Sequence, residues 1–401
     1  MTDRRRLLAG AGALCLSPIL NAGAGALEGK AAPSPAVPIP ALRHGVNLSA
    51  WLQLDRRQPC GPADFATIWE AGFDHVRVCV DFSTLGWRVD DPLDVPGIGD
   101  LDRAIAMASE AGLAAILDCH GNHDFHRCLE ASPAAGDALV GLWRSLAERY
   151  ADVPAERLAF ELLNEPQYYE SPADAWPRLQ ARVLRVVREA APPRAVLVTG
   201  RYGGGIEGLS ELTLEGLGDG RDGLIGVFHY YQPYVVTHQG ANWGFAGTGI
   251  PLLRRVPYPP ARFDEAPPTI VTGPDQAAAR RTLADYAWSD WGADRIAAEI
   301  AVAAAWGRRT GLPLLCSEFG VYRPFAPSED RWHWIRDVRT ALEGEGIGWT
   351  VWDYADDFGI AVVEGDTPAT WRERHRSPPP NRRRVLAPEA SDALDLRGRL
   401  S

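Results

Sequence analysis

Short apolar runs alternate with longer amphipathic stretches along the chain from about residue 42 onward. Eight of these runs have the length and the aliphatic, β-branched character of buried strands. They are His44–Leu48, His75–Val80, Ala114–Asp118, Leu158–Leu163, Ala195–Thr199, Leu224–Phe228, Leu312–Ser317 and Gly348–Trp352. The pattern therefore predicts eight strands.

The segments between the runs have the apolar periodicity of helices that cover a sheet, and several end at a glycine, as helices prefer. Examples are Leu101–Glu110, Ala138–Tyr150, Ala181–Ala190 and Ile296–Thr310. Strand and helix thus alternate eight times, which predicts an α/β fold of the (β/α)8 TIM-barrel type in a single domain over residues 41–401. A doubly wound open sheet is the alternative, but only the barrel makes eight strands natural.

The interval between the sixth and seventh runs, about Tyr230 to Asp294, is much longer than a usual loop. It is rich in aromatic residues: Tyr230, Tyr231, Tyr234, Trp243, Tyr258, Tyr286, Trp288 and Trp291. On the C-terminal face of a barrel such a loop is expected to build a substrate groove. The alternative is that its rings only cover a helix.

Composition narrows the class of protein. Hydrophobic residues make up 46% of the 401 residues, which supplies a large core and excludes disorder of the whole chain. The formal net charge of −11 argues against a nucleic-acid partner, because phosphate binding requires a basic surface. A neutral polymer or a small ligand fits better.

The first residues have the order of an export signal. Arg4 and Arg5 precede an apolar stretch, Leu7–Leu20, and small residues follow it. Residues 1–26 are therefore predicted to be a signal of the twin-arginine kind, with an ordinary secretory signal or an uncleaved anchor as alternatives. An Ala/Pro-rich spacer over residues 27–40 would follow. The protein that remains after removal of this signal is expected in the periplasm or outside the cell, with no membrane segment.

Five cysteines remain beyond the predicted signal. Cys79, Cys119 and Cys316 lie in apolar runs and are predicted to be buried small hydrophobic residues. Cys60 and Cys128 are predicted to lie in loops, where a disulfide between them could form in an oxidising compartment.

Two glutamates follow apolar strands in positions typical of catalytic groups. Glu165 lies in the sequence Phe160-Glu-Leu-Leu-Asn-Glu-Pro, and Glu318 ends the seventh run. On a barrel, the carboxyl ends of the strands are where catalytic groups lie. Two carboxylates close together are what retaining glycoside cleavage requires, one to protonate the leaving oxygen and one to attack the anomeric carbon. Each glutamate alone could be a helix N-terminal charge, but Asn164 beside Glu165 makes that improbable.

Other strand ends supply groups that fit this chemistry. Arg77 lies in the second run and could keep a carboxylate ionised, His120 follows the third, and His229 and Tyr231 follow the sixth. Trp352 ends the eighth run, where an indole can form a platform under a sugar ring. Each has a structural alternative: an ion pair for Arg77, and core packing for the histidines and the tryptophan.

Taken in chain order, Asn164-Glu165-Pro166, Glu318-Phe319-Gly320, His229-Tyr230-Tyr231 and the residues named above resemble glycoside hydrolase family 5, the cellulase-type family of clan A. The resemblance extends from His44 through the segment after Trp352. It implies that Glu165 is the acid/base, Glu318 the nucleophile and Asn164 the donor to the sugar 2-hydroxyl. Arg77 and Tyr231 would be partners of Glu318, His120 and His229 would shape the glycone side, and Trp352 would be a stacking platform.

Three histidines within seven residues, His120, His123 and His126, suggest a metal site. Their spacing fits no common zinc motif, and the family resemblance implies catalysis without a metal, so no metal and no other cofactor is expected. These histidines could equally line a sugar subsite.

The expected substrate is a β-linked polysaccharide or oligosaccharide, most simply an internal β-1,4-glucan linkage. Flat glucan rings stack on aromatic side chains, and Trp51, Trp243 and Trp352 could supply several such platforms. The alternatives are a β-mannanase, a β-1,3-glucanase, an exo-acting β-glucosidase, or a catalytically inactive carbohydrate-binding protein. Oligomeric state is left open.

Overall fold

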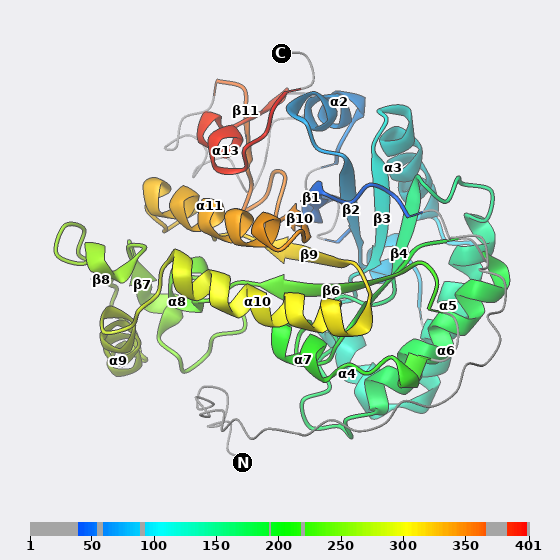
Figure 1. Ribbon diagram of the computed structural model, residues 1–401, viewed down its shortest axis with the longest axis horizontal. Helices are drawn as coiled ribbons and strands as arrows, with labels where there is room; N and C mark the ends of the chain where they lie inside the picture. Colours follow the sequence, from blue (N-terminus) through cyan, green and yellow to red (C-terminus); the bar gives the residue numbers. More distant parts are fainter. Residues whose placement is uncertain are drawn as a thin grey trace, which may run out of the picture. The chain divides into compact units, whose positions relative to one another are not determined.

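The computed structural model describes residues 39–53, 59–88, 93–191, 194–217, 221–365 and 383–398. Eight parallel strands close into a barrel in the order β1-β10-β9-β6-β5-β4-β3-β2 (Figure 1). The strands are β1 (His44–Leu48), β2 (His75–Val80), β3 (Ala114–Cys119), β4 (Leu158–Glu161), β5 (Val196–Thr199), β6 (Leu224–Tyr230), β9 (Leu314–Phe319) and β10 (Gly348–Val351). The predicted (β/α)8 barrel is confirmed, and the open sheet is excluded because β1 pairs with both β2 and β10.

Most of the helices cover the outside of the barrel (Figure 1). The described helices are α1 (Ser49–Leu52), α2 (Pro62–Ala71), α3 (Ile98–Glu110), α4 (His123–Ala131), α5 (Pro133–Arg149), α6 (Ala175–Ala190), α7 (Ile206–Glu211), α8 (Tyr234–Thr237), α9 (Gln276–Ala287), α10 (Ala293–Thr310), α11 (Ser328–Gly344) and α13 (Pro388–Ala393), of which α9 packs beside α8 and β8 and not on the barrel. Two small antiparallel sheets lie outside the barrel, β7 (Leu253–Arg254) with β8 (Thr269–Ile270) and β11 (Ala361–Val363) with β12 (Arg384–Leu386). All eight predicted strands and four predicted helices are present; His44–Leu48 and His75–Val80 have the predicted ends, and the other elements have one or both ends shifted.

Two shifted strand ends concern the candidate site. The fourth strand ends at Glu161 rather than Leu163, because the Asn164 N–H turns to donate to the Cys119 carbonyl at 2.9 Å. The seventh predicted strand begins at Leu314 because Pro313 has no amide hydrogen for the sheet, and it runs on to Phe319. Glu318 therefore lies inside a strand and not after it.

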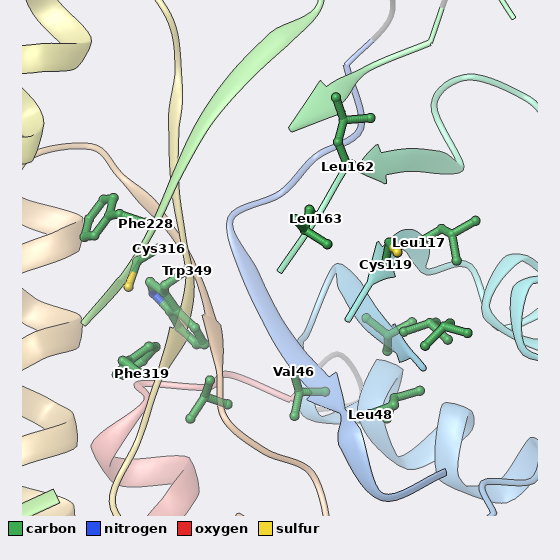
Figure 2. Packing of buried hydrophobic residues seen from close by; sticks show 14 of the residues in the cluster. Val46, Leu48, Leu117, Cys119, Leu162, Leu163, Phe228, Cys316, Phe319 and Trp349 are labelled. Atoms are coloured by element: carbon green, nitrogen blue, oxygen red, sulfur yellow. The ribbon is translucent and has the colours of Figure 1, made fainter. Parts of the chain in front are cut away.

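The apolar core has two layers. Side chains that point out from the strands pack against the helices, and Figure 2 shows Phe228, Cys316, Phe319 and Trp349 together in this outer layer. A smaller cluster fills the inside of the barrel: Ile116, Ala159, Ala195, Leu197, Ile225, Val227 and Leu315. Side chains that point outward and side chains that point into the barrel alternate along the strands, because successive residues of a strand face opposite sides of the sheet.

The inward-facing positions change from apolar to polar toward the C-terminal ends of the strands. On five strands, a buried polar side chain follows an inward-facing apolar side chain by two residues. The pairs are Ile116 with Asp118, Ala159 with Glu161, Leu197 with Thr199, Val227 with His229 and Leu315 with Ser317. The same strands thus provide both a dry barrel floor and a polar layer above it.

The long interval after β6 contains α8, α9, β7 and β8, and its aromatic residues differ in their exposure to solvent. Tyr230, Tyr231, Tyr258 and Tyr286 are buried, so packing accounts for half of the predicted set. Tyr234, Trp243 and Trp288 are exposed. Trp51, expected as a platform, is 5% exposed and belongs to the core, so that expectation was wrong.

Cys79, Cys119 and Cys316 are buried, as predicted. Cys128 lies within α4 and not in a loop, and its exposed thiol is free, so it does not pair with Cys60. Among the described residues, no helix has the length and apolar character needed to cross a bilayer. The predicted export signal over residues 1–26 and most of the spacer over residues 27–40 lie outside the described residues.

Candidate active site

The structure brings the two predicted glutamates together at the C-terminal ends of the barrel strands. One carboxylate oxygen of Glu165, one of Glu318 and one ring nitrogen of His229 all lie within 4.8 Å of one another. Nδ1 of His229 is 2.9 Å from Oε1 of Glu165 and 3.5 Å from Oε2 of Glu318. His229 is thus a bridge between the two carboxyl groups.

A β-bulge in β9 places Glu318 opposite His229. Phe228 pairs with Cys316 and His229 pairs with Glu318, so Ser317 is the extra residue of the bulge. Bulges commonly re-aim a side chain next to an active site. Nε2 of His229 lies 3.1 Å from Oγ of Ser317, which fixes the other edge of the ring.

Glu165 occupies a backbone conformation that is unfavourable for a side-chain-bearing residue. Its φ is +42°, in the left-handed region that costs roughly 1–2 kcal/mol outside glycine. Contacts over-determine this geometry: the Asn164 N–H is bonded to β3, and the Gln167 side-chain amide donates to the Glu165 carbonyl at 2.9 Å. Strain held at such a place is typical of functional positions.

The two glutamates have different environments. The Glu318 side chain is 5% exposed, whereas that of Glu165 is 35% exposed. Burial of the Glu165 carboxyl raises its pKa, which favours its protonated form. Glu318 instead accepts hydrogen bonds from the Arg77 guanidinium and the Tyr231 phenol. The two carboxyl groups thus differ in exposure and in hydrogen-bond partners.

Arg77 is the hub of the buried polar layer. Nη1 of Arg77 donates to Glu318 at 2.8 Å, Nη2 donates to Oδ1 of Asn164 at 2.8 Å, and Glu161 accepts from Nε at 2.7 Å and from Nη2 at 2.9 Å. Asp118 lies 3.0 Å from Nη2. The guanidinium therefore aligns Glu318 and Asn164 from below with a fixed geometry.

Three carboxyl groups surround this single positive charge. Burial raises the pKa of Asp118 to about 7 and also raises the pKa of Glu161. Arg77 is the cationic group that all three of them share, and it donates to Glu318 at 2.8 Å. Asp118, Glu161 and Asn47, which accepts from Arg77 at 3.0 Å, had no predicted role.

Tyr231 supplies the second donor to the enclosed carboxylate. Its hydroxyl donates to Oε2 of Glu318 at 2.9 Å. The ring is held edge-on by His238 and Phe358, with centroid distances of 5.1 Å and 6.1 Å. The hydroxyl position therefore depends on an aromatic cluster that forms only in the folded protein.

His120 and Trp352 form a flat surface on the opposite flank. Their rings stack with centroids 5.5 Å apart and an angle of 19° between planes. Nδ1 of His120 lies 2.7 Å from Asp118, which links the stack to Arg77. Burial lowers the pKa of His120 to about 4, and that of His229 also to about 4, so both rings are neutral at pH 7.

Two donor groups among the described residues could in principle hold a metal ion. One is Cys79, Asp118 and His120, and the other is Glu165, His229 and Glu318. His123 and His126 belong to neither group: His123 is exposed, and Nε2 of buried His126 lies 3.4 Å from the His120 carbonyl. The three-histidine hypothesis therefore lacks a common centre.

All eight predicted site residues thus lie at one end of the barrel. Glu165, Glu318, Arg77, Asn164, His229 and Tyr231 form one network, and His120 and Trp352 form the stacked pair beside it.

Comparison with known proteins adds an independent finding. The sequence profile described as Cellulase (glycosyl hydrolase family 5) matches residues 44–358. Endoglucanase C of Acetivibrio thermocellus is 28% identical over 334 residues, which cover 79% of this chain and 92% of that protein. A probable glucan 1,3-beta-glucosidase A of Aspergillus fumigatus is 30% identical, but over 43% of this chain and 44% of that protein. A solved structure titled as a hyperthermophilic endo-beta-1,4-glucanase in complex with substrate superposes with a TM-score of 0.67 and 23% identity, covering 88% of this chain and 97% of that one.

Proposed function

This chain belongs to glycosyl hydrolase family 5, the cellulase family, and we propose that within it the protein is an endo-acting β-1,4-glucanase that retains the β configuration. Glu165 is the general acid/base of this proposal and Glu318 is the nucleophile. The chemistry of the described network supports both roles, and neither needs a cofactor.

The observation that carries the proposal is the separation of the two carboxyl groups. Retaining glycosidases hold them about 5–5.5 Å apart, whereas inverting enzymes need about 6.5–9.5 Å to admit a water. The Glu165 and Glu318 oxygens within 4.8 Å of each other, with His229 between them, match the shorter class. A carbohydrate-binding protein without turnover would have no use for this arrangement.

The reaction then has two balanced steps. In the first, a Glu318 oxygen attacks the anomeric carbon while the Glu165 proton passes to the leaving oxygen, which gives a glycosyl ester and a free hydroxyl on the departing chain. In the second, Glu165 takes a proton from water, the water oxygen attacks the anomeric carbon, and the Glu318 carboxylate is released. Two inversions leave the product in the β configuration.

The network explains how one glutamate serves in both steps. While Glu318 is ionised, a negative charge within 4.8 Å opposes ionisation of Glu165, and burial of Glu165 also raises its pKa. Once Glu318 is esterified, that negative charge is gone, the pKa of Glu165 falls, and the group becomes the base. His229 can follow the change, because a neutral imidazole contacts a carboxyl or a carboxylate by exchanging its tautomer.

In this proposal Asn164 donates to the sugar 2-hydroxyl. Its Oδ1 accepts a hydrogen bond from Arg77 at 2.8 Å, which leaves its amide hydrogens for the substrate. Bonds to that hydroxyl strengthen at the transition state of glycoside cleavage. Trp352, stacked on His120, supplies the platform for the same sugar ring.

The substrate assignment is tested by product length. We expect rapid loss of viscosity from carboxymethyl-cellulose and release of cello-oligosaccharides from β-1,4- and mixed-linkage glucans, because the flat platform suits equatorial glucan rings. The same protein should be assayed on mannan and on β-1,3-glucan as matched polymers. Exclusive release of monosaccharide, or activity confined to mannan or β-1,3-glucan, would overturn the assignment in favour of another specificity of the family.

The proposal includes location and partners. We place the enzyme in the periplasm or outside the cell, supported by the twin-arginine-like order of Arg4, Arg5 and the apolar stretch after them. Its partner is the β-linked glucan, and the net charge of −11 disfavours nucleic acid.

A further inference from the structure

The two glutamates divide the rim of the barrel into unequal halves. In the closed strand order, removing β4 and β9 leaves β10, β1, β2 and β3 on one side and β5 and β6 on the other. The Trp352–His120 stack belongs to the first side, since the two residues follow β10 and β3. If a sugar ring rests there, the departing part of the substrate must extend over the loops after β4, β5 and β6.

Those loops carry several aromatic side chains that remain open to solvent. Tyr169, after β4, is 47% exposed, and Tyr234, at the start of α8 after β6, is 38% exposed; Trp243, further along the same loop, packs edge-on against Tyr322. Tyr169 also lies 5.6 Å from the ring of Tyr202, after β5, at an angle of 31°. Tyr169 and Tyr234 are the exposed tyrosines of the described residues, and both lie in the loops over which the departing chain would extend.

Backbone contacts fix this aromatic surface to the catalytic acid. The Tyr202 N–H donates to the Gln167 carbonyl at 3.1 Å, and the Gly203 N–H donates to the Pro166 carbonyl at 3.0 Å. A side chain at Gly203 would come within 3.1 Å of the Tyr169 hydroxyl, and one at Gly204 within 3.7 Å of the Glu165 Cα. Glycines with φ near +70° therefore let the β5 loop lie directly against both residues.

The charge of Glu165 reaches both tyrosines. Burial, and after it the Glu165 carboxylate, raises the pKa of the Tyr169 hydroxyl to about 12, and the same two causes raise the pKa of Tyr234. Tyr234 is also connected to the nucleophile through ring contacts. Its ring packs on His238 at 5.3 Å, and His238 packs on Tyr231, which donates to Glu318. Tyr169 thus lies at the β5 loop that contacts Glu165, and Tyr234 lies on the aromatic cluster that holds Tyr231 beside Glu318.

We propose that Tyr169 and Tyr234 form the leaving-group subsite, which binds the first glucose ring of the departing chain. Each ring offers a face for the C–H surface of a sugar and a hydroxyl for its polar edge. The inference rests on the proposed function of Glu165 and Glu318 and adds the residues that select the leaving group.

The test compares a substrate that fills the subsite with one that leaves it empty. Cellotetraose places sugar on the departing side, whereas β-cellobiosyl fluoride loses only fluoride, which occupies no sugar site. For Tyr169→Ala and Tyr234→Ala we expect kcat/KM on cellotetraose to fall roughly tenfold, with the fluoride unchanged within about twofold. Tyr169→Phe and Tyr234→Phe, which keep the rings, should stay within about threefold of the parent on both.

A second readout does not depend on how much of a variant is folded. With cellobiosyl fluoride as donor and cellobiose as acceptor, the acceptor must bind in the same subsite, so the ratio of transfer to hydrolysis should fall in both alanine variants. Trp288→Ala is the matched control, because Trp288 is 93% exposed at the end of α9 and makes no ring contact among the described residues.

The outcomes separate the two claims. An unaltered transfer ratio, or equal losses on cellotetraose and on the fluoride, would overturn the subsite. Failure of the parent enzyme to hydrolyse cellobiosyl fluoride would instead overturn the proposed function on which it rests.

Discussion

Replacing Glu318 with alanine should reduce kcat/KM by at least about 10⁴-fold on every β-glucan and every aryl β-glycoside, because no covalent route remains. Substrates with excellent leaving groups should lose as much as cellulose does, since the missing step is the attack and not the departure. The measurement is steady-state hydrolysis of cellotetraose and of 2,4-dinitrophenyl β-cellobioside by parent and variant.

Azide provides the specific control for this variant. A small anion that enters the space left by the Glu318 carboxylate attacks the same face of the sugar, so it should restore turnover and give an α-glycosyl azide. Glu318→Gln is the matched variant of equal size. Arg77 keeps its two bonds to Glu161 in both variants, so the thermal unfolding midpoint should stay near that of the parent. A β-glycosyl azide, or unassisted turnover above one percent of the parent (roughly a 2.7 kcal/mol loss), would contradict the assignment.

Replacing Glu165 with alanine should lower kcat/KM on glucans by about 10²–10⁴-fold, the usual contribution of a general acid. Glycosylation by 2,4-dinitrophenyl β-cellobioside or β-cellobiosyl fluoride should be nearly unaffected, because those leaving groups need no proton. Hydrolysis of the glycosyl ester should then become limiting, and azide should accelerate it to give a β-glycosyl azide. This anomer is opposite to the one expected for the Glu318 variant.

The pH dependence distinguishes the same role. Burial raises the pKa of Glu165, and a general acid acts in its protonated form, so the activity of the parent on glucan should decline as the pH rises through that pKa. The alanine variant assayed with the fluoride should lack this alkaline limb. Persistence of the limb would assign the titration to another group.

The barrel could be predicted because its signal is local. Each strand is a short apolar run, and each catalytic candidate follows such a run, so strand ends in sequence become neighbours in space through closure of the barrel. Glu165 and Glu318 could be found by this rule although 153 positions separate them in the chain (318 − 165).

The partners of Arg77 were missed although their signal was present. Asp118 and Glu161 each follow an inward apolar residue, Ile116 or Ala159, by two positions, and a charged residue continuing an inward alternation must lie inside the barrel. Glu161 lies in the same motif as Glu165, but only Glu165 was predicted to have a chemical role.

The fate of aromatic residues in loops could not be predicted in the same way. Trp51 is buried and Tyr169 is exposed, although both follow barrel strands. Which ring faces solvent depends on contacts between loops, such as the bonds that join Gln167 to Tyr202, and no periodic pattern encodes such contacts.

The anomeric configuration of the first product tests the central claim most directly. Cellotetraose hydrolysis should be followed by proton NMR, with enough enzyme to finish cleavage before mutarotation. Retention through a Glu318 ester predicts that the β anomer of the new reducing end appears first and that the α anomer grows in only afterwards. Appearance of the α anomer first would mean inversion by direct attack of water, and it would contradict the pairing of Glu165 with Glu318 as acid and nucleophile.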